Sequence, residues 1–345
     1  MRVLVVKLTS MGDVLHLMPA LSDLVAAHPK ITIDWMVEDS FAEIPAWHPN
    51  VDRVISVSTR RWRKLKWQNF QQFTAFLKQL RATPYDAVID AQGLIKSAVF
   101  ARFAKLNKGG FRAGYSGSSI KESPAAKFYH RKADVARDQH AIERLRQLFS
   151  LTFDYALSSD ELNYKVSLSK PVIDQSNTIM LFHGTTWATK HLPEKLWREI
   201  ADLACEDGYK VKLAWGNDAE RQRAEWIAQD RPDVSVLSRS SLSDLAHTIS
   251  GIVGAIAVDT GLGHMAAALG VPCVSVYGST NSALTGAVGK NQVLIQSTYS
   301  CSPCLLKECP KLSEKLLDPP CYKASEANSK LSAMAIWQTL YRQIA

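Results

Sequence analysis

One aspartate near the amino terminus, Asp13, has the setting of a general base. It follows Val3–Val6, a continuous apolar run rich in β-branched residues, which is typical of a parallel strand buried on both faces. Thr9, Ser10 and Gly12 interrupt that run and predict a turn. Ligands of open α/β sheets bind at the carboxyl ends of the strands, so a carboxylate placed there is a candidate for proton transfer.

Two later turns carry residue types that bind phosphate. His183-Gly-Thr-Thr186 follows one apolar run and precedes Lys190, and hydroxyls with a lysine suit phosphate oxygens. Asp259-Thr-Gly-Leu-Gly-His264 follows a second apolar run and opens a helix, whose first N–H groups can bind an anion. Each turn could instead be an ordinary turn or helix cap. Neither is a Walker A loop or GxGxxG, which argues against a P-loop NTPase and a dinucleotide oxidoreductase.

Glu220 is a candidate for binding a ribose. It lies just after the strand expected at 210–215, where the acidic residue of a nucleotide-binding fold accepts hydrogen bonds from ribose hydroxyls. A solvated glutamate at the start of a helix is the plainer alternative.

The densest basic segment is Arg60-Arg-Trp-Arg-Lys-Leu-Lys-Trp67. Arginine mixed with tryptophan suits a multiply anionic ligand at a membrane–water boundary, and each basic residue near an anionic leaflet is worth about 1 kcal/mol. A solvated helix face and a nucleic-acid patch are the alternatives. No RRM, KH, helix-turn-helix or zinc-finger pattern accompanies the segment, so nucleic acid is the weaker candidate partner.

Four of the six cysteines gather late in the chain and leave two interpretations open. Cys301 and Cys304 have the first spacing of a zinc site, but Cys309 and Cys321 lie farther apart than in a zinc ribbon. No secretory context favours disulfides. Free thiols or a redox-labile pair are therefore favoured over metal, and no metal ligand is assigned.

The elements that must position these groups belong to a chain of 345 residues, which is long for one core and suits two domains. No leader-peptide pattern and no apolar run of about 18 residues is found, so we expect a cytoplasmic protein. The net charge of +8 favours an anionic partner: nucleic acid, an anionic lipid surface or a phosphorylated substrate.

Strands and helices alternate in both halves, which predicts mainly parallel sheets. Pro19 suits the first turn of a helix, so we expect one helical turn around Gly12–His16 and a longer helix from about Pro19. Residues 107–125 are rich in Gly, Ser and Lys and predict a loop, and residues 151–176 predict an interdomain linker. Strands are expected at 31–37, 51–57, 85–90, 178–182, 210–215, 234–237, 254–258 and 272–277, and an amphipathic helix at 327–344.

Together the motifs resemble those of one family, in order through nearly the whole chain. The matching stretches are Lys7…Ser10-Met-Gly-Asp-Val-Leu-His16, Asp90-Ala-Gln-Gly93, His183-Gly-Thr-Thr186 and Asp259-Thr-Gly-Leu-Gly-His264…Tyr277-Gly-Ser-Thr280. They resemble the ADP-heptose:lipopolysaccharide heptosyltransferases of glycosyltransferase family 9. Arg60-Arg-Trp-Arg-Lys64 and Trp215-Gly216…Glu220 are most similar to the heptosyltransferase I group of that family.

The resemblance implies an α/β fold of the GT-B type, with two facing Rossmann-like domains and a cleft between them. Residues 1–160 would form the acceptor-binding domain and 161–325 the nucleotide-sugar-binding domain. Residues 326–345 would form a helix that packs back on the N-terminal domain.

The implied activity is an inverting, metal-independent transfer without a cofactor. L-glycero-D-manno-heptose would move from ADP-heptose to the first Kdo of Kdo2–lipid A during synthesis of the lipopolysaccharide inner core. The enzyme would be cytoplasmic, peripheral to the inner face of the inner membrane, and would bind no nucleic acid. There are two alternatives. One is a second heptosyltransferase that acts on the heptosylated core, since the late cysteines resemble those of that enzyme. The other is a sugar-nucleotide enzyme whose substrate is not a heptose.

The resemblance also implies roles for individual residues. Asp13 would deprotonate the acceptor hydroxyl. The donor-binding residues would be Thr185, Thr186 and Lys190 at the diphosphate and heptose, with Thr260, Gly261 and His264 beside them, Glu220 at the ribose and Asp259 at the heptose hydroxyls. The acceptor-binding residues would be Arg60, Arg61, Arg63, Lys64 and Lys121. Where heptosyltransferase I has Arg-Glu-Pro, this chain has Lys121-Glu122-Ser123, which keeps the charge and loses the bidentate fork.

Overall fold

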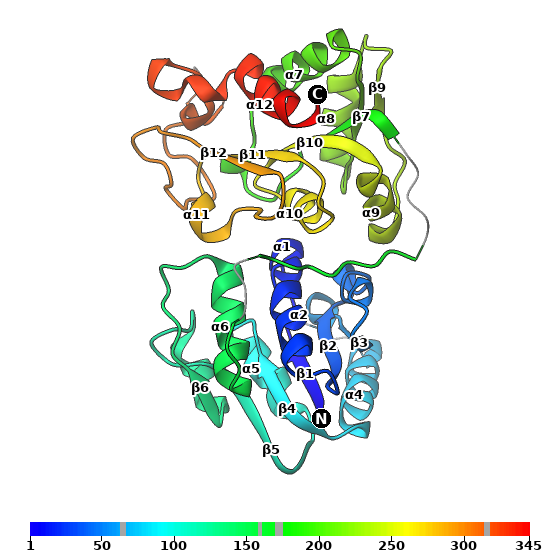
Figure 1. The fold of residues 1–345 in the computed structure, drawn as a ribbon, viewed down its shortest axis with the longest axis vertical. Coiled ribbons are helices and arrows are strands. Elements are labelled where there is room, and N and C mark those ends of the chain that lie inside the picture. Colours follow the sequence, from blue (N-terminus) through cyan, green and yellow to red (C-terminus); the bar gives the residue numbers. More distant parts are fainter. Residues whose placement is uncertain (63–66, 158–160, 170–174, 314–317) are drawn as a thin grey trace. The chain divides into compact units, whose positions relative to one another are not determined.

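The computed structural model describes residues 1–62, 67–157, 161–169, 175–313 and 318–345 (Figure 1). The chain divides into two compact units, Met1–Ser167 and Leu168–Ala345. The division falls inside the predicted linker and shortly after the predicted boundary at residue 160. Each unit is built on one six-stranded parallel sheet, as the alternation of strands and helices predicted.

The first unit has the strand order β3-β2-β1-β4-β5-β6. Val3–Val6 is fully buried, which agrees with its continuous apolar sequence. The strands are β1 (Arg2–Val6), β2 (Thr32–Glu38), β3 (Val51–Val57), β4 (Tyr85–Asp90), β5 (Leu106–Tyr115) and β6 (Arg131–Ala133). The helices are α1 (Met11–Leu15), α2 (Met18–Ala27), α3 (Thr59–Trp62), α4 (Trp67–Ala82), α5 (Ile95–Phe103) and α6 (Ala141–Phe153).

The second unit has the strand order β12-β11-β10-β7-β8-β9. Its strands are β7 (Gln175–Phe182), β8 (Lys210–Leu213), β9 (Val234–Val236), β10 (Ile252–Val258), β11 (Cys273–Tyr277) and β12 (Gln292–Gln296). Its helices are α7 (Glu194–Glu206), α8 (Asp218–Ala228), α9 (Leu242–Ser250), α10 (Gly261–Ala268), α11 (Ser282–Thr285) and α12 (Ala333–Ile344).

Both sheets therefore have the doubly wound order. The first three strands extend from the centre of the sheet to one edge, and the last three extend from the centre to the other edge. The direction reverses between β1 and β4 in the first unit and between β7 and β10 in the second. Such a reversal leaves a crevice at the carboxyl ends of the two central strands, which is where ligands of open α/β sheets bind. The turns that the sequence singled out follow three of these four strands: Asp13 follows β1, His183–Thr186 follows β7 and Asp259 follows β10.

One prediction about an element was wrong. Residues 106–115 form strand β5 and not a loop. The polar first half of the segment is exposed, which is why it resembles a loop in sequence. The second half is buried and pairs with β4. Helix α12 packs on α7 and β10 within the second unit. Gly254 of β10 makes room for it, since a Cβ at that position would lie 2.9 Å from a methyl of Leu340.

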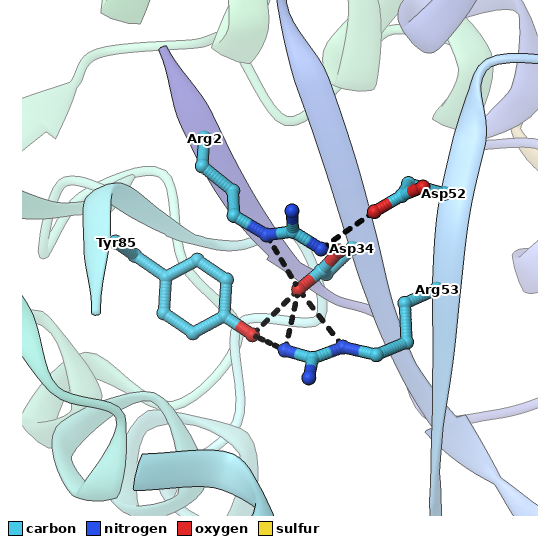
Figure 2. A network of polar contacts seen from close by, with 5 residues as sticks. All are labelled: Arg2, Asp34, Asp52, Arg53 and Tyr85. Atoms are coloured by element: carbon cyan, nitrogen blue, oxygen red, sulfur yellow. Dashed lines mark hydrogen bonds and ion pairs between the residues drawn. The ribbon is translucent and has the colours of Figure 1, made fainter. Parts of the chain in front are cut away.

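A charged network ties together four strands of the first unit near the amino ends of β1 and β4 (Figure 2). Asp34 of β2 is fully buried, and its carboxylate is 2.6 Å from the guanidinium of Arg2 and 2.7 Å from that of Arg53. The hydroxyl of Tyr85 donates to the same carboxylate at 2.8 Å. Arg2 also reaches the exposed Asp52 at 2.6 Å. One buried anion is thus neutralised by two cations from the strands on either side of it.

Two buried histidines should make the protein less stable in mild acid. His48 accepts a hydrogen bond at Nδ1 from the backbone N–H of Asn50, so Nε2 carries the hydrogen and faces the Ser22 hydroxyl at 3.1 Å. Burial, followed by the charge of Lys165, lowers the pKa of His48 to about 4. Burial, followed by the charge of Arg223, lowers the pKa of His183 to about 4.

Because both pKa values are depressed, the unfolded chain takes up protons first as the pH falls. The free energy of unfolding should therefore fall between pH 6.5 and about 4 by up to roughly 3 kcal/mol per histidine, and should not fall further below that range from this cause. Urea unfolding at a series of pH values measures the slope. A His48→Gln variant should lose that residue's share of the slope, and an unchanged slope would contradict this account.

Candidate active site

Asp13 lies in the short helix α1, in the turn that follows β1. Its Oδ2 accepts hydrogen bonds from the backbone N–H and the hydroxyl of Ser10, both at 2.8 Å. The carboxylate keeps 42% of its surface exposed, so an incoming hydroxyl can reach it. A second helix, α2, begins at Met18 with Pro19 in its first turn, as the sequence predicted. Asp13 is thus held by its own turn while remaining accessible.

Lys7 forms an ion pair with this carboxylate. Its Nζ is 3.6 Å from Asp13 Oδ1, and its side chain is only 7% exposed. The same ammonium donates to the carbonyl of Ala91 at 3.2 Å, which fixes it between the ends of β1 and β4. Lys7 belongs to the motif that runs from Lys7 to His16, and its residue type alone indicated no role. Its position stabilises the charge on Asp13 and orients the carboxylate.

Gln92 connects the turn after β4 to the turn after β1. Its Oε1 accepts from the backbone N–H groups of Leu8 and Thr9, at 2.9 and 3.1 Å. The backbone N–H of Gln92 donates in turn to the fully buried Asp90, which also accepts from the hydroxyl of Tyr129 at 2.6 Å. Burial is the largest influence on Asp90 and raises the pKa of its carboxyl. These groups fix the chain that leads into Asp13, although the sequence alone gave them no function.

The basic segment is only partly described. Arg61 is exposed, and its guanidinium is 3.4 Å from Asp39. Trp62 is turned into the aromatic cluster of Phe73, Phe76 and Phe100, with ring centroids 5.1 to 6.3 Å away. The tryptophan therefore anchors the segment. Arg63 and Lys64 lie outside the described residues, as does the side chain of Arg60.

Lys121 is exposed in the loop after β5. Its neighbour Glu122 accepts a hydrogen bond at 2.7 Å from the backbone N–H of Ile95, the first residue of α5. The carboxylate thereby ties this loop to the start of a helix.

In the second unit, Asp259 joins the two phosphate-type turns. Its carboxylate is 2.7 Å from Lys190 Nζ and accepts from the Thr280 hydroxyl at 2.6 Å. Its backbone carbonyl accepts from the hydroxyl of Thr185 at 2.9 Å. The sequence predicted separate roles for Lys190 and Asp259, and the structure pairs them. The pairing follows from the adjacency of β7 and β10 in the sheet.

The start of helix α10 has no side-chain cap. Thr260 is the N-cap residue of this helix. Its side chain does not accept a capping hydrogen bond from the backbone, in contrast to an ordinary N-cap threonine. A Cβ at Gly263 would lie 3.3 Å from both Ala257 Cβ and Ser275 Oγ, so this glycine lets the helix sit close to the sheet. Gly261 is the first residue of the helix, and His264 is buried in the same turn. Thr186 lies on the neighbouring turn after β7 and is exposed.

Glu220 spans the turns after β7 and β8. Its Oε2 accepts from the backbone N–H of Gly216 at 2.7 Å. A Cβ at Gly184 would lie 2.7 Å from the Glu220 carboxyl carbon, so the carboxylate lies close against this glycine. Glu220 thus lies in the first turn of α8, with its carboxylate beside the phosphate-type turn.

The late cysteines are free thiols in the structure. Cys321 is buried, and burial, followed by the neighbouring thiols of Cys301, Cys304 and Cys309, raises its pKa to about 12. Within the described part of the chain, no set of three or more His, Cys, Asp or Glu side chains is arranged to hold a metal ion. In the same residues every helix is too short or too polar to cross a lipid bilayer.

Two doubly wound parallel sheets, each with polar groups at its switch point, agree with the GT-B class of glycosyltransferases, and a solved heptosyltransferase shares this fold. Among solved structures, the Escherichia coli heptosyltransferase WaaC with ADP matches with a TM-score of 0.85 and 38% identity over 99% of this chain and 100% of that one. The same protein with ADP-2-deoxy-2-fluoro heptose matches with a TM-score of 0.83 and 38% identity over 99% of each chain.

Sequence comparison gives the family. Lipopolysaccharide heptosyltransferase 1 of Pseudomonas aeruginosa is 47% identical over 313 residues, which are 90% of this chain and 87% of that protein. The model of glycosyltransferase family 9 (heptosyltransferase) matches residues 73–314. The chain belongs to glycosyltransferase family 9, and the family predicted from its motifs is confirmed.

Proposed function

We propose that this heptosyltransferase moves L-glycero-D-manno-heptose from ADP-heptose to the first Kdo of Kdo2–lipid A, with inversion at the anomeric carbon. The observation that carries the proposal is the likeness to a heptosyltransferase solved with ADP and with an ADP-heptose analogue, at 38% identity over nearly the whole chain. The protein works on the cytoplasmic side of the inner membrane as a peripheral enzyme, since its net charge of +8 suits an anionic leaflet.

Asp13 is the base of the proposed reaction. As the acceptor oxygen attacks the anomeric carbon, its proton passes to the Asp13 carboxylate. The bond from that carbon to the diphosphate oxygen breaks, and its electron pair leaves with ADP. A single displacement of this kind inverts the anomeric centre. Ser10 and Lys7 hold the carboxylate in one orientation, and such orientation is a large part of acid–base catalysis.

The second unit supplies the donor contacts. Lys190 and the N-terminus of α10 balance the charge that builds on the departing diphosphate, helped by the hydroxyls of Thr185, Thr186 and Thr260. Preorganised groups of this kind cost little reorganisation during the reaction. Asp259 accepts from heptose hydroxyls and Glu220 from the ribose, with Gly261 and His264 beside the diphosphate.

The first unit supplies the acceptor contacts through Arg60, Arg61, Arg63, Lys64 and Lys121. Removing the charge at Arg61, the described and exposed member of the basic segment, should raise the acceptor KM about fivefold, because a basic residue near anionic lipid is worth about 1 kcal/mol. The donor KM should stay unchanged. Arg81→Ala, which removes an exposed arginine of α4, is the control. An equal rise in both KM values for Arg61→Ala would argue against acceptor binding.

The decisive experiment offers ADP-heptose with either Kdo2–lipid A or the already heptosylated acceptor. Transfer to Kdo2–lipid A alone supports the proposal. Transfer only to the heptosylated core would make the chain a second heptosyltransferase, and transfer from another sugar nucleotide but not from ADP-heptose would make the donor assignment wrong.

A further inference from the structure

Three consecutive residues, Leu305–Lys307, form a strap that is fixed to two turns of the second unit. The backbone N–H of Leu305 donates to the carbonyl of Ser279 at 2.7 Å. At the other end, Thr189 donates through its hydroxyl to the carbonyl of Leu306 at 2.6 Å, and through its N–H to that of Lys307 at 3.4 Å. Ser279 and Thr189 are almost fully buried, so both attachment points are rigid.

The attachment points lie on either side of the strand that leads to Asp259. Ser279 follows β11 and Thr189 follows β7, and in the sheet β10 lies between these two strands. Just before the strap, the hydroxyl of Ser302 donates to the carbonyl of Gly278 at 2.6 Å. The strap is therefore held across the carboxyl edge of the sheet at the strand that ends in the Asp259 turn.

The strap brings a second ammonium group to Trp187. Lys307 Nζ is 5.7 Å from the centroid of the indole ring, and Lys190 Nζ is 4.6 Å from it. The charge of Lys190 is compensated by Asp259 at 2.7 Å. No carboxylate of the described residues forms an ion pair with Lys307. The group around Trp187 therefore carries one positive charge more than its acid can balance, which favours an anion there.

We propose that Lys307 is a second cation for the donor diphosphate, positioned by the strap; this inference rests on the proposed donor site. A lysine ammonium is a compact point charge that suits a phosphate oxygen. While Asp259 shares Lys190, one lysine cannot neutralise a diphosphate. When the bond to the anomeric carbon breaks, its electron pair passes to a phosphate oxygen, and Lys307 stabilises the added charge.

The test measures the binding of ADP and AMP by calorimetry to the wild-type protein and three variants. Lys307→Met should weaken ADP binding about tenfold, the size expected for one hydrogen bond to a charged group, and should weaken AMP binding much less. Lys307→Arg keeps the charge and should bind ADP within about threefold of wild type. Lys311→Met removes another exposed lysine, which lies 5.1 Å from the ring of Tyr299, and should bind like wild type.

Steady-state kinetics show whether the substitution affects the donor site alone. Lys307→Met should raise the donor KM and leave the acceptor KM unchanged. If the wild-type protein binds ADP and Lys307→Met binds it equally well, the inference is overturned while the proposed function stands. If the wild-type protein does not bind ADP, the donor site fails and this inference fails with it. A loss of ADP binding equal for Lys307→Met and Lys311→Met would also overturn it, because general surface charge would then explain the effect.

Discussion

Replacing Asp13 by asparagine will stop heptose transfer and leave ADP binding unchanged. Asparagine has the same shape, and its amide oxygen can still accept from the N–H and hydroxyl of Ser10, so the turn after β1 should keep its structure. It cannot take the proton of the acceptor hydroxyl. A positioned general base contributes about 100- to 10,000-fold, so kcat should fall by that factor.

The measurement pairs a transfer assay with ADP calorimetry on the same preparation. Asp138→Asn, which changes an exposed carboxylate of the same unit, is the control and should transfer at the wild-type rate. An Asp13→Asn enzyme whose kcat stays within about tenfold of wild type would rule out Asp13 as the base. A variant that loses transfer and ADP binding together would point to a structural defect.

Replacing Asp34 by alanine will destabilise the first unit by about 3–5 kcal/mol, because removing one partner of a buried charge network leaves the others uncompensated. Asp34 is fully buried, and Arg2, Arg53 and Tyr85 all bind its carboxylate (Figure 2). The two guanidinium groups are about 30% exposed and can recover some hydration, which favours the lower end of this range.

Asp52 provides a matched control for this change. It pairs with the same Arg2 at 2.6 Å, but its side chain is 54% exposed. Exposed ion pairs contribute at most about 1 kcal/mol, so Asp52→Ala should shift the urea midpoint only slightly. Equal losses from the two substitutions would show that burial of Asp34 does not determine the stability of this network.

The sequence predicted those elements whose local pattern is decisive. A continuous apolar run predicted β1, and Pro19 separated α1 from α2. The sequence could not predict features that depend on a distant partner. The apolar stripe of α12 showed that one face is buried, but nothing local indicated that Gly254 of β10 provides the space for it. Likewise β5 begins with exposed polar residues and exists because β4 pairs with it.

The candidate site divides in the same way. Asp13 and the phosphate-type turns could be found from residue types that follow apolar runs. The ion pair of Lys190 with Asp259 could not, because it depends on β7 lying beside β10. Lys307 gave no signal at all, since its position is set by hydrogen bonds from Leu305 to Ser279 and from Thr189 to the backbone carbonyls of Leu306 and Lys307.

The central position of β1 also determines when the first unit can fold during synthesis. Val3 pairs with Ile33 on one side and with Ala87 on the other, so one edge of β1 has no partner until β4 has been made. Until then the nascent chain presents a row of unpaired N–H and C=O groups on an apolar strand, which is a template for aggregation. Fragments that end before β4 should therefore aggregate more readily than fragments that include all six strands of this sheet.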